Sequence, residues 1–126
     1  MAKQYSQLFI DFTASYETYQ KVTDVLGVTP QPHDSNEIPD LWFYRLERCS
    51  EDRQEDFINH FLDLLEPNFE ELERLGINRK NILFWYVYEY EYQCSMSFTP
   101  SELLRLGESG ITMNIDCHDF THRKSL

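Results

Sequence analysis

Positively charged residues are scarce in this sequence. Lysine and arginine total 11 against 22 aspartates and glutamates, which gives a formal net charge of −11 at pH 7. Because phosphate groups and anionic lipid headgroups repel such a surface, binding to nucleic acid or to a membrane is disfavoured. The same charge would attract a basic macromolecule over a long range, although it is also typical of an ordinary well-solvated protein.

Glycine is scarce as well, and the residue patterns of common catalytic sites are missing. The four glycines form no phosphate-binding loop, no Gly-x-Ser-x-Gly motif occurs, and the four histidines are scattered. Cys117, His118 and His122 lie close together but lack the paired spacings of a structural zinc site. We therefore assign no catalytic residue, predict neither metal nor cofactor, and expect a protein that is not an enzyme.

Cysteine and long apolar runs are the remaining shortages. The three cysteines, Cys49, Cys94 and Cys117, are odd in number and widely spaced, which predicts free thiols in a reducing cytoplasm. No run approaches the roughly 18 apolar residues that span a bilayer. The first residues, "MAKQYSQ", do not have the pattern of a signal peptide. With 41% hydrophobic and 15% aromatic residues, the chain is expected to fold as a single domain over residues 1–126.

Alternating apolar residues and helix-capping signals predict the order of the elements. Strands are expected over 5–13, 41–49, 82–98 and 111–117, and a proline-rich loop over 28–40. Helices are expected to begin after the capping residues Ser15, Ser50 and Thr99, with a break at Pro67 in the second. The sequence therefore predicts an α+β domain: a four-stranded mixed sheet with helices packed mainly on one face, and two βαβ-like halves joined by a central helix.

The segment "ILFWYVYEYEYQCSMSF" (82–98) carries carboxylates inside the most apolar part of the chain. If the whole segment is extended, its alternate residues Phe84 to Phe98, including four tyrosines, share one face and pack under the helices. Glu89 and Glu91 then stand side by side in water on the other face, beside Trp85. Phe43 of the second strand falls on the same face, so we predict that this face, with Glu89, Glu91, Trp85 and Phe43, binds a partner.

A second acidic surface is predicted on the central helix. Asp52, Asp56, Asp63 and Glu66 lie on the side opposite its apolar stripe, where a cationic partner could dock. A solvated face is the commoner explanation of such a stripe.

Several segments resemble a bacterial family known only as domain of unknown function 4279. They are "LGVTP" after the first helix, Trp42 in the second strand, "FLDLLEPNFEELERLG" in the middle, and "FTPSELLRLGESGITMNID" near the end. The family brings no reaction with it. Small acidic proteins of this sort are similar to immunity proteins encoded beside bacterial toxins, so the resemblance implies a binding protein that neutralises a basic toxin.

Two other functions stay open at this point. A pocket between the sheet and the proline-rich loop could bind a small ligand or carry out a reaction. Alternatively, the chain could form a structural homodimer through the aromatic sheet face or a sheet edge.

Overall fold

The computed structural model describes residues 4–47 and 56–119. The strands are β1 (Gln4–Asp11), β2 (Leu41–Glu47), β3 (Ile82–Tyr90) and β4 (Thr112–Asp119), and the helices are α1 (Tyr16–Leu26), α2 (Phe57–Leu65), α3 (Phe69–Arg74) and α4 (Pro100–Ser109). Two single 3₁₀ turns, Glu66–Asn68 and Arg79–Asn81, complete the described elements.

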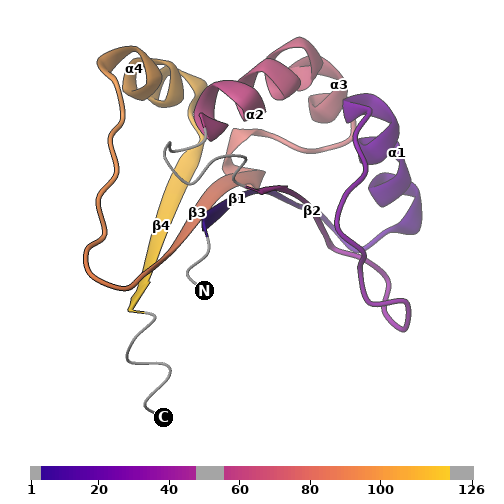
Figure 1. Cartoon of the computed structure of the whole chain (residues 1–126). Coiled ribbons are helices and arrows are strands. Elements are labelled where there is room, and N and C mark those ends of the chain that lie inside the picture. The colour runs from indigo at the N-terminus through magenta and orange to yellow at the C-terminus, as the bar shows by residue number, and fades with distance from the viewer. Residues whose placement is uncertain (1–3, 48–55, 120–126) are drawn as a thin grey trace.

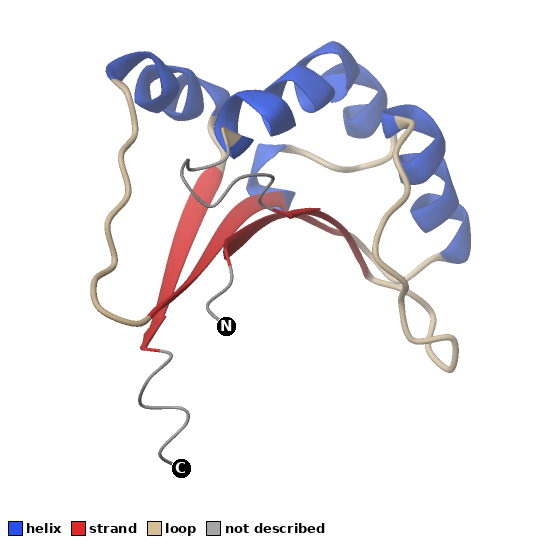
Figure 2. Cartoon of the chain, viewed as in Figure 1, coloured by secondary structure: helices blue, strands red, loops and turns tan. Residues whose placement is uncertain are grey.

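The four strands form one mixed sheet in the order β2-β1-β3-β4. Strand β1 is antiparallel to both β2 and β3, whereas β3 and β4 are parallel. The described helices all lie on one face of the sheet, and none of residues 4–47 and 56–119 forms a helix over the other face (Figures 1 and 2). This arrangement confirms the predicted α+β fold, and the two β-α-β segments are joined through α2 and α3.

Local capping chemistry fixes where three of the helices begin or break, as predicted. The Ser15 hydroxyl accepts a hydrogen bond from the Thr18 amide at 3.1 Å. At the start of α4, the Thr99 hydroxyl accepts from the Glu102 amide while the Glu102 carboxylate accepts from the Thr99 amide. Pro67 lies in the 3₁₀ turn that separates α2 from α3, because proline cannot donate the hydrogen bond that would continue a helix.

The predicted cap of the second helix, Ser50, lies outside the described residues. The described helix α2 begins at Phe57, and its cap is Asp56, whose carboxylate accepts from the Asn59 amide at 3.2 Å. The acidic residue that we predicted as part of a docking stripe is therefore also the residue that starts this helix.

The core lies between the helices and the covered face of the sheet. It contains the fully buried side chains of Leu8, Trp42, Phe61 and Phe84, and Phe57 stacks on Tyr86 with ring centroids 5.0 Å apart. Every second residue of β3 from Ile82 to Tyr86 points into this core, as the alternation predicted.

The prediction of a strand from 82 to 98 is wrong beyond Tyr90. Because β4 runs parallel to β3, the chain must return to the other end of the sheet before β4 can begin. Residues 91–99 make that return without regular structure, with Met96 and Phe98 packed against the core. Tyr92, which was expected under the helices, is 92% exposed.

The side of β4 that faces the helices is only partly buried. Ile111 is buried and Met113 packs against the core, but Ile115 is 44% exposed and Cys117 is exposed. In Figure 1, α2 and α4 lie over the end of the sheet where β4 begins, and the far end of β4 extends past them. Alternation therefore set which face each side chain occupies, but not how far the helices reach along the strand.

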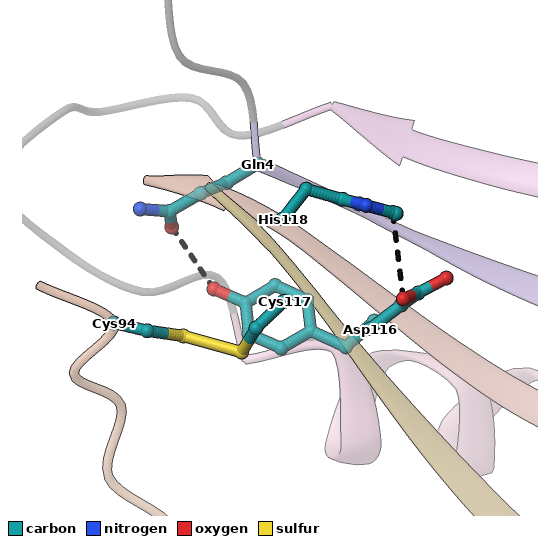
Figure 3. The surroundings of a disulfide bond; sticks show 6 residues. Gln4, Cys94, Asp116, Cys117 and His118 are labelled. Atoms are coloured by element: carbon teal, nitrogen blue, oxygen red, sulfur yellow. Dashed lines mark hydrogen bonds and ion pairs between the residues drawn. A yellow bond between two sulfur atoms is a disulfide. The ribbon is translucent and has the colours of Figure 1, made fainter. Parts of the chain in front are cut away.

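The cysteine prediction is wrong for two of the three residues. Cys94, in the return segment, and Cys117, on β4, form a disulfide with their Cα atoms 6.8 Å apart (Figure 3). The two residues are 23 positions apart in the sequence, and the parallel crossover brings them together. Cys49 lies outside the described residues, so the prediction of free thiols is not supported for the pair that the structure describes.

Candidate partner-binding face

The helix-free side of the sheet is the candidate site, and we call it the open face. Strand register places on it alternate residues of all four strands: Leu41, Phe43 and Arg45 from β2; Tyr5, Gln7, Phe9 and Asp11 from β1; Leu83, Trp85, Val87 and Glu89 from β3; and Thr112, Asn114, Asp116 and His118 from β4. The residues of each strand between these positions turn toward the helices.

One end of the open face is an apolar patch, which we define as Phe9, Leu41, Phe43, Leu83 and Trp85. The Phe9 ring lies between two others, with its centroid 5.3 Å from that of Phe43 and 5.5 Å from that of Trp85. Leu41 is 37% exposed, and the other four side chains are half-buried. Rings that remain partly in water on a surface without helical cover are typical of a contact site.

The other end of the open face is polar and internally bonded. The Arg45 guanidinium donates to the Gln7 side-chain oxygen at 3.0 and 3.1 Å and lies 4.4 Å from the centre of the Tyr5 ring. On β4, Asp116 and His118 form a pair with 3.4 Å between carboxylate oxygen and imidazole nitrogen (Figure 3). We call these residues, with Glu89, the polar end.

The structure contradicts the predicted pair of water-exposed carboxylates. Glu89 lies on the open face as predicted, but it is only 8% exposed. Since β3 is a central strand between β1 and β4, Glu89 has neighbours on both sides, including His118 in register with it. Glu91 is exposed, but it lies beyond the end of β3 and is not part of the sheet. The two acids therefore do not form one docking surface.

The predicted aromatic residues are where the sequence placed them. Trp85 and Phe43 both lie on the open face, on strands separated by β1, and Phe9 of β1 contacts both rings. Alternation alone identified the face of these side chains. Their contact depends on strand order, which the sequence did not provide.

The predicted acidic stripe on the central helix is largely engaged in holding the fold together. The Arg105 guanidinium of α4 donates to Asp63 at 2.8 Å, to Glu66 at 2.6 Å and to the Asn59 side-chain oxygen at 2.7 Å. The hydrogen bonds to Glu66 and Asp63, together with the negative charges of these two carboxylates, raise the pKa of Arg105. Asp56 caps α2, and Asp52 lies outside the described residues. We therefore give this stripe less weight than the open face.

A pocket of about 450 Å³ opens beside the apolar patch. It is lined by Phe9, Asp11, Leu41, Lys80, Asn81, Ile82, Leu83, Trp85 and Thr112. No residue of the proline-rich loop lines it. Instead, that loop lies beside β2, where the Gln31 amide donates to the Phe43 carbonyl at 2.8 Å. This pocket, at the end of the open face, is therefore a different one from the pocket predicted between the sheet and the loop.

One buried donor at this pocket has no partner. The indole Nε1–H of Trp85 has no hydrogen-bond acceptor among residues 4–47 and 56–119. By contrast, the indole of the core residue Trp42 donates to the Thr23 hydroxyl at 3.0 Å. Most buried donors are paired in folded proteins, so the Trp85 indole requires a specific explanation.

Neither a metal centre nor a membrane segment emerges from the described residues. Within these residues, no group of three or more histidine, cysteine, aspartate or glutamate side chains could hold a metal ion. No helix in the same part of the chain is long and apolar enough to cross a membrane.

Comparison with known proteins adds no assignment: neither a family model, nor a curated protein, nor a solved structure matches this chain.

Proposed function

We propose that this chain is a non-enzymatic binding protein that holds a basic protein partner on the open face of its sheet. The single observation that supports this most is the apolar patch, which joins three strands on a face without helical cover. Aromatic side chains at the centre of an interface commonly supply most of its binding free energy.

The charge of the chain supports the choice of a basic partner. A net charge of −11 attracts a cationic protein and repels an acidic one, a nucleic acid or an anionic membrane. Asp11 is exposed at the end of β1, next to the apolar patch, and the Asp116 side chain, at the polar end, is 41% exposed on β4. Exposed carboxylates at the border of an interface mainly accelerate association with a cationic partner.

The family resemblance supports a more specific version of the proposal. Immunity proteins neutralise bacterial toxins by binding them, and a toxin that acts on nucleic acid needs a basic surface to hold its substrate. On this proposal the chain covers the basic surface of such a toxin in the cytoplasm. The apolar patch holds the complex together.

The test compares two lysine substitutions that change the net charge equally. Leu41→Lys lies in the apolar patch, and Leu104→Lys lies on α4, where Leu104 is 64% exposed. Wild-type protein is used to capture a partner from the native host, the partner is identified and purified, and its affinity for both variants is measured. We expect Leu41→Lys to weaken binding at least about 30-fold and Leu104→Lys to change it less than about threefold.

The outcome that contradicts the proposal is equally specific. Equal loss of affinity in both variants would place the interface elsewhere, and a captured partner that is acidic would remove the electrostatic argument. If no partner is retained and the purified chain instead shows a concentration-dependent mass, the chain self-associates and the proposal is wrong.

A further inference from the structure

The pocket beside the apolar patch has the size and lining of a site for one large side chain. Its volume of about 450 Å³ lies near the low end of the range for ligand pockets, roughly 300–1,000 Å³. Its walls are apolar and are provided by Phe9, Leu41, Leu83 and Trp85. The Phe9 and Trp85 rings are inclined at 72°, an edge-to-face arrangement that leaves ring surface available to a third aromatic group.

The rim of the pocket has a positioned carboxylate. Asp11 accepts a hydrogen bond from the Asn81 side-chain nitrogen at 2.9 Å, which holds the carboxylate at the pocket edge. An ionised carboxylate can accept further hydrogen bonds, so Asp11 can also receive a cation. Lys80 lies at the same rim and is exposed, and its flexible side chain makes no ion pair among the described residues.

The Trp85 indole forms one wall of the pocket and can report on what enters it. Its Nε1–H is closed to solvent and finds no acceptor among the described residues, so an entering group contacts the indole ring and not this donor. The N–H signal of Trp85 is therefore a probe of ring contact in the pocket.

From these observations we propose that the pocket receives an aromatic side chain of the basic partner, flanked in the partner's sequence by lysine or arginine. The ring packs against Phe9 and Trp85, and a flanking cation pairs with Asp11. This inference rests on the proposed function, since it names the part of the partner that the open face holds.

Three short peptides test the inference without the partner. The first is acetyl-Lys-Phe-Lys-amide, the second replaces both lysines with glutamate, and the third replaces phenylalanine with alanine. Binding is followed by NMR through the two indole N–H signals, which are assigned with Trp85→Phe. Trp42, which is buried and bonded to Thr23, serves as an internal reference within the same protein.

We expect the lysine–phenylalanine peptide to shift the Trp85 indole signal, because its ring packs against that indole, and to leave the Trp42 signal unchanged. It should bind at least about tenfold more tightly than either of the other two peptides, because each of those lacks one of the two recognised groups. Asp11→Asn should reduce the preference for the lysine peptide over the glutamate peptide about three- to tenfold. Glu70→Gln, in helix α3 on the other side of the sheet, should not change that preference.

The outcomes separate this inference from the proposed function. Binding of the glutamate peptide as tightly as the lysine peptide, or no shift of the Trp85 signal at millimolar peptide, would overturn the inference. If the peptide fails but the captured partner still depends on Leu41, only the inference is lost. If the peptide binds and no basic partner depends on Leu41, the pocket chemistry stands and the proposed function is wrong.

Discussion

At the scale of single residues, Arg105 connects two helices through several polar partners. It joins α4 to α2 through Asn59, Asp63 and Glu66, with donor–acceptor distances of 2.6 to 2.8 Å. Its side chain is only 28% exposed, so these bonds are partly shielded from water. Because one guanidinium makes all these hydrogen bonds, the entropy cost of ordering its side chain arises only once.

We therefore predict that Arg105→Met lowers the free energy of unfolding by about 1–2 kcal/mol, with solvent screening of the exposed acids included. The matched control is Arg74→Met. Arg74 pairs with Glu71 on the same helix, with both side chains more than half exposed, and its loss should cost no more than about 0.5 kcal/mol. Urea denaturation of both variants provides the measurement, and equal effects would show that Arg105 does not join the helices.

At the scale of elements, two glycines whose surroundings leave room for a side chain allow the effect of backbone conformation on stability to be measured without a change in packing. A Cβ atom added at Gly27 or at Gly107 would meet no other atom within 4 Å. Gly27 ends α1 in the left-handed conformation, with φ of +69°, whereas Gly107 lies inside α4. Any difference between alanine substitutions at the two positions is therefore a backbone effect.

We predict opposite signs for these substitutions. Gly107→Ala should raise the free energy of unfolding by about 0.5–1 kcal/mol, since alanine favours a helix and restricts the unfolded chain. Gly27→Ala should lower it by about 1 kcal/mol, because a Cβ atom disfavours the left-handed conformation. Thermal unfolding of the pair checks this, and a stabilising Gly27→Ala would disprove the capping role assigned to that residue.

The Cys94–Cys117 disulfide encloses the return segment, α4 and most of β4 in one covalent loop. By the chain-entropy argument, closing a loop of this length stabilises a fold by about 3 kcal/mol. We predict that a reducing agent lowers the stability of the Cys49→Ser variant, which keeps the disulfide, by about that amount. The reducing agent should leave unchanged the same variant with Cys94→Ser and Cys117→Ser added. Cys49→Ser prevents thiol exchange in both proteins, and a Cys49→Ser variant insensitive to reduction would contradict the prediction.

The same disulfide bears on where the protein works. Disulfides persist mainly in oxidising compartments, so the inference of a reducing cytoplasm from unpaired cysteines has lost its basis. Alkylation of thiols in freshly lysed host cells would show whether Cys94 and Cys117 are free there. We expect free thiols if the cytoplasmic location in the proposed function is right, and a protected pair would contradict that location.

Patterns within one element were predictable, and relations between elements were not. The caps at Ser15 and Thr99, the break at Pro67 and the faces of Trp85 and Phe43 all follow from residues close in sequence. The burial of Glu89 and the early end of β3 depend on β4 lying parallel beside β3. So does the disulfide. No local pattern encodes which strand becomes a neighbour, which is why these three predictions were wrong.

At the scale of the whole molecule, charge and apolar contact have separate roles in the proposed complex. The 22 acidic residues act together at a distance, and this long-range field is screened by salt. The apolar patch acts only after contact, and its contribution depends little on ionic strength. The association rate should therefore depend mainly on the charge of the molecule, and the dissociation rate mainly on the contacts of the apolar patch.

We predict that the association rate with the basic partner falls about 10- to 100-fold as salt rises from about 0.02 M to about 0.5 M. The dissociation rate should change less than about threefold over the same range, because rings buried between Phe9, Phe43 and Trp85 are not held by charge. Phe43→Ala should raise the dissociation rate and leave the dependence of the association rate on salt unchanged. Stopped-flow and surface-binding kinetics measure both rates. An association rate that ignores salt would mean that the charge of −11 serves solubility alone, and that the partner need not be basic.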